Sequence, residues 1–429
     1  MQVLVIGSGG REHALAWQAS LSDDVSKVFV APGNAGTALE EKLENIAIDA
    51  DDYDSLLIFA QENNIELTIV GPEAPLVDGI VNQFTEAGLA CFGPDSGAAQ
   101  LEGSKAFTKD FLDRNNIPTA AYGNFTDIAA AKDFVVKSAT PIVIKADGLA
   151  AGKGVIIAQT EAEAFAAIED MLAGNRFGEA GHRVVVEEFL VGEEASFIVM
   201  VDGKNILPLA TSQDHKARDN GDLGPNTGGM GAYSPAAVVT DDIFQRVMKE
   251  VIEPTVSSMA KEGNSYTGFL YAGLMIDPKG GLKVLEYNCR FGDPETQPIM
   301  MRLKTSLAKL CLAAVQGRLN EVEAQWDERA AVGVVLAAGG YPDSYQKGRQ
   351  ISFPNQPLPE HMKIFHAGTS QGPNGEIVTQ GGRVLCATAL GNSVTEAQAA
   401  AYELVDLVSW DEMYFRTDIA YRAIAREAS

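Results

Sequence analysis

The sequence predicts a mixed protein, part α/β and part α+β, with a doubly wound parallel-sheet domain first, then a small lid lobe and a C-terminal α/β unit. In the first hundred residues, short apolar runs alternate with amphipathic stretches, and Gly or Pro follows each run. This pattern is typical of parallel βαβ units. From Pro141 onward, predicted strands cluster around a single helix, which favours an α+β lobe. The 429 residues suffice for roughly three domains of about 150 residues each.

The N-terminal unit is expected to hold four strands, with a helix from Arg11 to about Ser20. Buried-strand patterns occur at Val3–Ile6, Lys27–Val30, 65–69 and Leu89–Phe92. Ligands of such sheets bind beyond the carboxyl ends of the strands, so the residues that follow each strand are candidate site residues. We place domain boundaries after residues 102 and 325, which gives units 1–102, 103–325 and 326–429, with the small lobe at about 121–191.

The remaining elements follow from the same patterns. Strands are predicted at Ile142–Lys145, Val155–Ala158, Val184–Glu188, Ser196–Val201, Phe269–Ile276, Leu282–Tyr287, Val332–Ala337, Lys363–Ala367 and Val384–Ala389. Helices are predicted at Glu161–Leu172, Asp241–Ala260, Thr296–Gln316 and Thr395–Leu407. The glycine-rich segment Ser212–Pro235 is expected to be a long functional loop.

Composition narrows the classes of function. Lys and Arg total 33 against 58 Asp and Glu, a formal net charge of −25, which disfavours nucleic acid and anionic lipid as partners. The four cysteines are far apart, which excludes a zinc ribbon and a disulfide framework and fits a reducing cytosol. No apolar run is long enough for a signal peptide or a membrane span, so a cytoplasmic location is expected.

Glycines follow the first predicted strand at Gly7–Gly10. A dinucleotide fingerprint is a poor match, because its third glycine falls on Glu12 and the acid expected after the second strand is replaced by Ala31-Pro32-Gly33. A turn that binds a smaller phosphate and a plain strand–helix turn both remain open. Asn34 and Glu73 follow the next strands and are either turn residues or part of a sugar-phosphate site.

The segment Ile144–Val155 holds three glycines and two lysines between strand ends, which suits a lid that closes over phosphates. It is no Walker A loop, since Gly154 stands where that motif needs Ser or Thr. A surface hairpin is the alternative, but it leaves Lys145 costly to bury without an anionic partner.

Acidic residues gather in two further places. The stretch Glu187–Glu194 could accept hydrogen bonds from an adenine amino group and ribose hydroxyls, although a solvated acidic turn is favoured when it is taken alone. Glu286 and Asn288 share one face of a strand and offer hard oxygen ligands for Mg²⁺. The charged run Arg290–Glu295 follows directly, and its density favours a site over a solvated salt-bridge cluster.

These motifs, in this order, resemble the ATP-grasp ligases. Within that superfamily the chain is similar to the phosphoribosylamine–glycine ligase (glycinamide ribonucleotide synthetase) family over nearly its whole length. The strings that carry this resemblance are Gly9–Leu15, Gln213–Lys216, Asn226–Gly231 and Arg290–Gln297. The resemblance implies an ATP-grasp fold and a carbon–nitrogen ligase of purine synthesis that joins glycine to 5-phosphoribosylamine through glycyl phosphate.

The resemblance also implies roles for single residues. ATP would be bound by Lys105, Lys145, Gly148, Gly152, Gly154, Glu187, Leu190 and Glu194. Substrates would be bound by Gly10, Asn34, Glu73, Asp214, Lys216, Arg290 and Asp293, of which Asp214, Arg290 and Asp293 would be catalytic. Glu286 and Asn288 would hold Mg²⁺ or Mn²⁺. The expected partners are small molecules only, and the chain is expected to be a monomer, with a dimer as the alternative.

One departure from the superfamily's pattern concerns the metal. Many ATP-grasp enzymes carry a further metal-binding acid on the preceding strand, where this chain has Leu274 and Met275. Two protein ligands with phosphates and water would then complete the metal's coordination. The rival classes are a nicotinamide-dependent oxidoreductase, a non-catalytic nucleotide sensor, and a sibling ATP-grasp enzyme that uses formate or bicarbonate.

Overall fold

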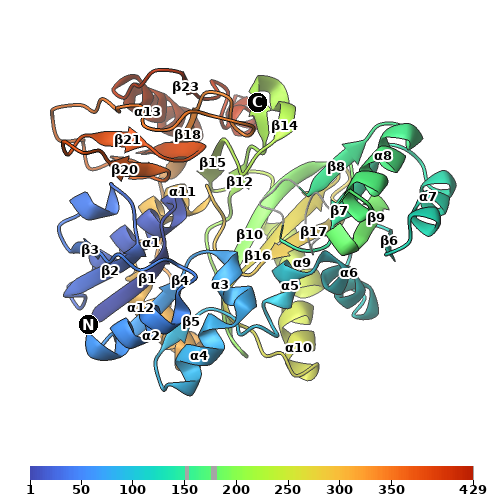
Figure 1. Ribbon diagram of the computed structural model, residues 1–429, viewed down its shortest axis with the longest axis horizontal. Coiled ribbons are helices and arrows are strands. Elements are labelled where there is room, and N and C mark those ends of the chain that lie inside the picture. Colours follow the sequence, from blue (N-terminus) through green and yellow to red (C-terminus); the bar gives the residue numbers. More distant parts are fainter. Residues whose placement is uncertain (150–153, 175–180, 429) are drawn as a thin grey trace.

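A computed structural model describes residues 1–149, 154–174 and 181–428 of the chain. In Figure 1 the N-terminal sheet and the C-terminal sheet lie on one side of the long central strands, and a small lobe lies on the other side. The central strands therefore form the floor between three peripheral units. No helix among the described residues is long and apolar enough to span a bilayer.

The N-terminal sheet is parallel and has the order β3-β2-β1-β4-β5, which confirms the predicted parallel unit. Its strands are β1 (Gln2–Gly7), β2 (Lys27–Pro32), β3 (Leu43–Asn45), β4 (Leu67–Val70) and β5 (Cys91–Phe92). Its helices are α1 (Gly10–Ser20), η1 (Thr37–Leu39), α2 (Tyr53–Glu62), α3 (Glu73–Asp78) and α4 (Ile80–Glu86). The sequence did not predict β3, because only Leu43 is buried in that strand of three residues.

The small lobe is an antiparallel sheet of order β6-β9-β7-β8, with two packed helices against it. Its elements are β6 (Tyr122–Phe125), α7 (Ile128–Lys137), β7 (Ile142–Ala146), β8 (Val155–Ala158), α8 (Glu161–Leu172) and β9 (Val184–Glu188). The predicted hairpin is confirmed, with Lys145 paired to Val155 across β7 and β8. Helices α5 (Gln100–Gly103) and α6 (Lys105–Arg114) connect this lobe to the N-terminal unit.

The central sheet is antiparallel, of order β11-β10-β16-β17. Its strands are β10 (Glu193–Asp202), β11 (Ile206–Pro208), β16 (Thr267–Ile276) and β17 (Leu282–Asn288). A register shift after Gly273 places that glycine, rather than Leu274 or Met275, opposite Glu286. A Cβ at Gly273 would lie 3.3 Å from Cγ of Glu286, so the absence of a side chain leaves room for the carboxylate.

Two predicted helices differ from the observed ones. The run predicted at Asp241–Ala260 is helical but contains a π-helical turn, as α9 (Asp241–Val247), η4 (Met248–Ile252) and α10 (Glu253–Lys261). The single helix predicted at Thr296–Gln316 is wrong, because α11 (Thr296–Arg302) and α12 (Leu307–Val315) are separate. Gln18 occupies the break: its amide donates to the Leu303 carbonyl at 2.9 Å and accepts from the Leu307 N–H at 3.1 Å.

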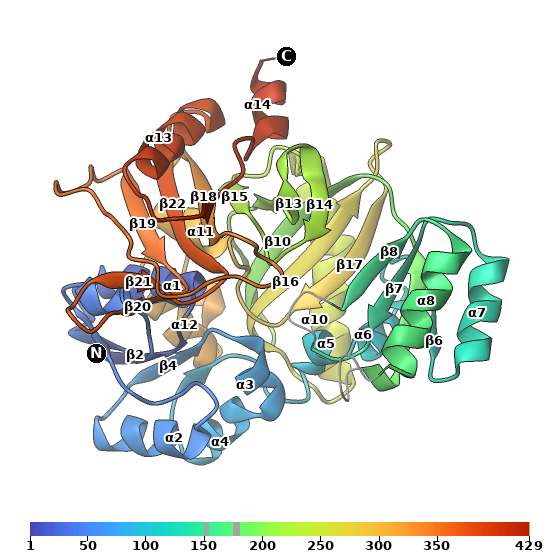
Figure 2. The ribbon, with the colours of Figure 1, turned by 45° about the horizontal axis from the view of Figure 1, so that its top comes forward.

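The segment Ser212–Pro235 is ordered rather than the long loop that was predicted. It forms β12 (Gln213–Asp214), β13 (Ala217–Asp219), η3 (Asn220–Asp222), β14 (Leu223–Asn226) and β15 (Gly231–Ser234). Arg416, which is fully buried, donates to the Ala217 carbonyl at 3.1 Å and to Asp222 at 3.0 Å. These contacts join residues about two hundred positions apart, so no local pattern reveals them. Figure 2 shows β13 and β14 near the segment that leads to the C-terminus.

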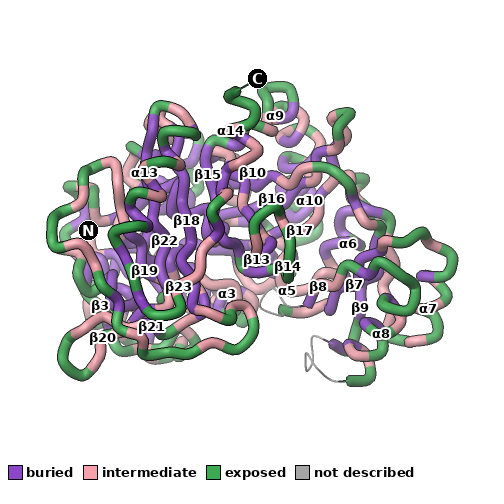
Figure 3. The backbone as a smooth tube through the Cα atoms, turned by 90° about the horizontal axis from the view of Figure 1, so that it is seen from above, coloured by how far each residue is buried: buried purple, intermediate pink, exposed green. Residues whose placement is uncertain are grey.

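The C-terminal unit has the sheet order β12-β15-β18-β22-β19, with β23 paired to β18. Its further elements are β18 (Ala330–Ala338), β19 (Met362–His366), β20 (Thr369–Gln371), β21 (Ile377–Thr379), β22 (Arg383–Gly391), α13 (Val394–Asp406), β23 (Met413–Tyr414) and α14 (Tyr421–Glu427). The short helix η5 (Leu319–Glu321) precedes this unit and lies against β11 and α12. The three predicted strands and the predicted helix are confirmed to within a few residues. Buried residues follow the strands of this sheet and of the central sheet in Figure 3, where the cores lie.

Candidate active site

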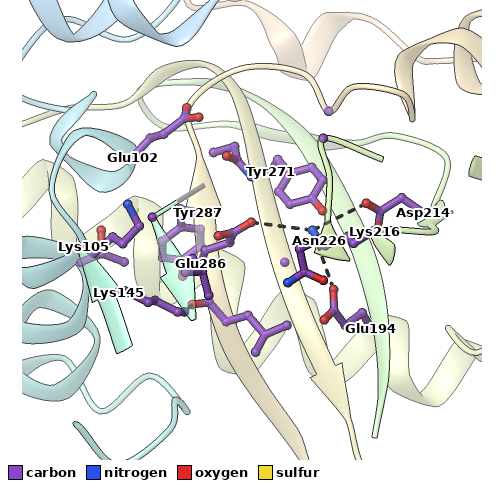
Figure 4. Close-up of a pocket in the computed structure, with 18 of the residues that line it drawn as sticks. Glu102, Lys105, Lys145, Glu194, Asp214, Lys216, Asn226, Tyr271, Glu286 and Tyr287 are labelled. Carbon is purple, nitrogen blue, oxygen red and sulfur yellow. Dashed lines mark hydrogen bonds and ion pairs between the residues drawn. The ribbon is translucent and has the colours of Figure 1, made fainter. Parts of the chain in front are cut away.

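A cavity of about 510 Å³ opens where the four sheets approach one another. Its walls come from the N-terminal unit, the small lobe, the central sheet and the C-terminal unit, and Figure 4 shows its charged side chains converging from several strands. The predicted site residues that line it are Glu73, Lys105, Lys145, Gly154, Glu187, Leu190, Glu194, Asp214, Lys216, Glu286, Asn288, Arg290 and Asp293.

Lysines form one side of the cavity. Lys105 begins α6, and its Nζ donates to the Gly148 carbonyl at 2.9 Å. Lys145 on β7 and Lys109 on α6 both form ion pairs with the buried carboxylate of Glu187 on β9. Burial lowers the pKa of Lys105, although the carboxylate of Glu286 opposes this. This side of the cavity therefore attracts an anion.

Glu187 should also matter for stability. Replacing Glu187 by Gln would leave Lys109 and Lys145 buried without a counter-charge, so we expect the free energy of unfolding to fall by about 3–5 kcal/mol. Urea denaturation measures this loss. Glu188→Gln is the matched control, because Glu188 is exposed: it accepts a long hydrogen bond from the Ala121 N–H and pairs at the surface with Lys283, an ion pair worth about 0–1 kcal/mol. Equal losses in both variants would contradict the buried ion-pair network.

Carboxylates surround Lys216 on the opposite side (Figure 4). The Lys216 ammonium lies 3.6 Å from Asp214, 3.7 Å from Glu194 and 3.8 Å from Glu286. Burial would lower the pKa of Lys216, but Asp214 and the other carboxylates raise it well above its usual range, so this side chain is a cation. Burial raises the pKa of the Asp214 carboxyl.

Glu286 and Asn288 lie two positions apart on β17, and both face the cavity. Burial would raise the pKa of Glu286, but Lys216 and Lys145 keep it below the usual range, so Glu286 is a carboxylate. Asn288 Oδ1 accepts a hydrogen bond from Arg290 at 3.0 Å. Among the described residues, no three His, Cys, Asp or Glu side chains group as a metal site. These two oxygen donors fit a hard cation whose other ligands are phosphates and water.

Arg290 joins this strand to the N-terminal unit. Its guanidinium lies 2.9 Å from Glu102 and 3.4 Å from Glu73. Burial raises the pKa of Glu102 to about 7, despite the attraction of Arg290. Burial opposes ionisation of Glu73 as well, but Arg290 and Arg11 lower the pKa of Glu73 to about 2. Of these two acids beside one arginine, Glu102 therefore keeps its proton to a much higher pH than Glu73 does.

Three predicted site residues lie away from the cavity lining, and one is not described. Gly10 packs against Gln297, and the Gly9 N–H donates to Glu12 at 2.7 Å, so a carboxylate occupies the turn where a phosphate was one option. The Asn34 amide donates to the Ser8 and His366 carbonyls, both at 2.9 Å, so its Nδ2 atom is bonded to protein oxygens. Gly148 contributes its carbonyl to Lys105, and Gly152 lies outside the described residues.

The sequence interpretation missed several residues that line the cavity. They are Arg11, Glu102, Lys109, Asn226, Tyr271, Glu295 and Arg383. Lys109 carried a signal, because it follows Lys105 by four residues and so shares its helix face. Glu295 lies in the charged run already noted, and its buried carboxylate accepts from Ser196 at 2.8 Å. Glu102 and Arg383 had no such signal in the sequence, because their partners Arg290 and Asp293 are distant along the chain.

The fold and the cavity together define an ATP-grasp enzyme, in which two antiparallel sheets flank a cavity lined by lysines and by the carboxylate–amide pair Glu286 and Asn288. Comparison with known proteins names the family. Residues 1–102, 103–296 and 331–422 match the N domain, the ATP-grasp (A) domain and the C domain of phosphoribosylglycinamide synthetase. The chain belongs to the phosphoribosylglycinamide synthetase family.

Individual relatives agree with that assignment. The phosphoribosylamine–glycine ligase of Vibrio parahaemolyticus is 67% identical over 427 residues, covering 100% of this chain and 99% of the relative. The crystal structure of the Thermotoga maritima phosphoribosylamine–glycine ligase is 35% identical, with a TM-score of 0.84 over 98% of this chain and 100% of that one. The biotin carboxylase domain of Hydrogenobacter thermophilus 2-oxoglutarate carboxylase, 16% identical, shares the fold with a TM-score of 0.75, covering 96% of this chain and 91% of that chain.

Proposed function

We propose that this chain uses ATP to join glycine to 5-phosphoribosylamine, giving glycinamide ribonucleotide, ADP and phosphate through enzyme-bound glycyl phosphate. One continuous cavity supports this proposal, because it connects the lysines of α6 and β7 with the turn Arg290–Asp293. A phosphoryl donor and an acceptor amine can therefore meet in one enclosed space. Phosphoribosylamine–glycine ligases with near-complete coverage of the chain support the choice of substrates.

The first step transfers the γ-phosphoryl group of ATP to the glycine carboxylate. An oxygen of glycine attacks phosphorus, the bond to the β-phosphate oxygen breaks, and ADP leaves. Such a transfer needs in-line positioning and neutralised charge more than a protein nucleophile. Lys105 and Lys145 supply positive charge beside Gly148 and Gly154, and Glu187, Leu190 and Glu194 are proposed to hold adenine and ribose.

Glu286 and Asn288 are proposed to hold Mg²⁺, or Mn²⁺ in its place. Their oxygen donors face the cavity between the lysines and Arg290, where phosphate oxygens would complete the coordination. An ion held by these two residues would supply positive charge that neutralises the phosphates. Glu286 remains ionised for this role, because Lys216 and Lys145 lower its pKa against the effect of burial.

The second step forms the amide bond. The amine of phosphoribosylamine attacks the acyl carbon, phosphate leaves with one of the former carboxylate oxygens, and the amine loses a proton. Arg290, Asp293 and Asp214 are proposed to position glycine and the amine, with Lys216 holding Asp214 in place. The Glu73 carboxylate lies 3.4 Å from the Arg290 guanidinium and is proposed to bind the ribose of the phosphoribosyl group. Gly10 and Asn34 are proposed to face phosphoribosylamine from the same N-terminal unit.

Several broader features accompany this proposal. We propose the unit 1–102 as the phosphoribosyl-binding domain, 103–325 as the ATP-grasp domain with its lid lobe, and 326–429 as the C-terminal domain. The substrates are small and water-soluble. We propose that the protein is cytoplasmic, that it is a monomer, with a dimer as the alternative, and that it has no nucleic-acid or membrane partner.

A coupled assay of ADP release tests the function. With Mg²⁺ and ATP, release should require both glycine and freshly made phosphoribosylamine, and mass spectrometry should find glycinamide ribonucleotide. Full turnover with formate or bicarbonate in place of glycine would assign the chain to a sibling activity instead. ADP release that ignores both substrates would contradict ligase function altogether.

A further inference from the structure

Arg383 brings the C-terminal unit into direct contact with the cavity. It begins β22, and its Nη1 donates to the Gly228 carbonyl at 2.5 Å and to the Asp293 carbonyl at 2.9 Å. Its Nη2 donates to Asp293 Oδ2 at 2.8 Å. One guanidinium therefore fastens the glycine-rich strand connection to the Asp293 corner.

Both backbone polar groups of Gly228 are hydrogen-bonded to the C-terminal unit, the carbonyl to Arg383 as described above. The Gly228 N–H donates to the hydroxyl of Tyr341, also from the C-terminal unit, at 3.0 Å. The next residue, Gly229, has a φ of +112°, which favours glycine, and a Cβ there would collide with the Pro294 ring. The connection between β14 and β15 is thus pressed against the residue that follows Asp293.

The Asp293 carboxylate is fixed in one orientation by the same arrangement. Arg383 binds Oδ2, and the Gln297 amide donates to Oδ1 at 3.2 Å. The Arg383 side chain is only 20% exposed, and both of its Nη atoms donate to protein oxygens. Arg383 therefore orients Asp293 and Gly228, and its Nη atoms are already engaged by protein oxygens rather than directed at a substrate anion.

We propose that Arg383 is a positioning residue for amide formation, which locks Asp293 and the Gly228–Gly229 connection over the acyl phosphate and so keeps water from it. This inference rests on the proposed function, since it assumes an acyl phosphate beside Asp293. The step it serves is attack of the amine on the acyl carbon with release of phosphate. When the contacts of Arg383 are lost, water attacks the acyl phosphate in place of the amine. Glycine and phosphate are then released, and ATP is consumed without formation of glycinamide ribonucleotide.

Arginine is suited to this role by its shape. The planar guanidinium directs donors at two acceptors at once, whereas a lysine ammonium is a single point charge on a flexible stem. Arg383→Lys should therefore keep charge complementarity to Asp293 but bridge the two segments poorly. Arg383→Gln should lose both the charge and the bridge.

The experiment measures ADP and glycinamide ribonucleotide in parallel, with full-length wild type, Arg383→Gln and Arg383→Lys. In Arg383→Gln, turnover to product should fall by about 100-fold, the cost of a misplacement near 1 Å. The ratio of ADP to product should rise clearly above one, while the KM for ATP stays within about twofold, because the lysines and Glu187 are untouched. Arg383→Lys should be intermediate in both measurements.

Arg349→Gln is the matched control, because Arg349 lies in the same unit and pairs with Asp411 and Glu412 at the surface. It should keep wild-type turnover and one ADP per product. Tyr341→Phe removes only the acceptor of the Gly228 N–H and should raise the ADP-to-product ratio modestly. If Arg383→Gln does not fold, the ADP-to-product ratios of Tyr341→Phe and Arg383→Lys test the proposed role of Arg383.

Two results would overturn the proposal. One is wild-type turnover and one-to-one coupling in the Arg383 variants. The other is a lowered unfolding midpoint with coupling still one-to-one, which would make Arg383 a structural residue only. Wild-type protein that makes no glycinamide ribonucleotide would instead refute the proposed function, so the two failures are distinguishable.

Discussion

Glu286→Gln is expected to lower turnover by about 100- to 1,000-fold, the scale of losing one electrostatic contact to a transition state. The carboxylate faces the cavity beside Asn288, and its ionised state is supported by Lys216 and Lys145. A neutral amide would bind a divalent cation weakly, so phosphate charge would be poorly neutralised. Raising the Mg²⁺ concentration should recover part of the turnover.

The fold should tolerate this substitution. Glu286 is half-exposed, its side chain being 38% accessible, and its contact with Lys216 is long at 3.8 Å. The unfolding midpoint should therefore change little, as in the surface control Glu250→Gln, which loses only a pair with Arg246. Wild-type turnover in Glu286→Gln would remove this residue from the proposed metal site.

Arg290→Lys is expected to reduce kcat/KM for phosphoribosylamine by about 100-fold or more, because a small misplacement of reacting groups is costly. Arg290 contacts Glu102, Glu73 and Asn288 together, and so aligns β17 with the N-terminal unit. Lysine keeps the charge but cannot reach three acceptors in fixed directions. The KM for ATP should change less, since the lysines on α6 and β7 remain.

Initial rates at varied phosphoribosylamine, with ATP and glycine saturating, measure this loss. Arg329→Lys is the control, because Arg329 pairs with Asp327 at a distance from the cavity lining. A rise in the KM for ATP that exceeds the loss with phosphoribosylamine would place Arg290 at the nucleotide instead. Unchanged kinetics would remove it from the site.

Local patterns predicted much of the fold. The hairpin of β7 and β8 and that of β16 and β17 follow from apolar runs joined by glycines, and Lys145 was marked by its cost of burial. The helix predicted at Thr296–Gln316 failed for two reasons: Ser306 caps the start of α12, a local signal that was missed, and Gln18, nearly three hundred residues earlier, bonds to both sides of the break. The prediction for Ser212–Pro235 failed for the second of these reasons, since the distant Arg416 bonds to it.

The sequence predicted those site residues that lie close together in one short motif. Glu286, Asn288 and Arg290 are close in sequence, and the structure brings them together with Lys216 and Lys145. Arg383 could not be predicted, because an arginine at the start of a strand is ordinary until the fold places it against Asp293. Motifs therefore reveal groups on one element, whereas groups joined by tertiary contacts need the structure.

A route through glycyl phosphate transfers an oxygen atom from glycine to inorganic phosphate, and isotope labelling detects this transfer. Glycine labelled with ¹⁸O in both carboxylate oxygens should donate one label to inorganic phosphate in each turnover, because phosphate leaves with a former carboxylate oxygen. Mass spectrometry of phosphate and of glycinamide ribonucleotide measures both fates, with the second label retained in the amide carbonyl. Unlabelled phosphate formed together with product would contradict an acyl phosphate intermediate.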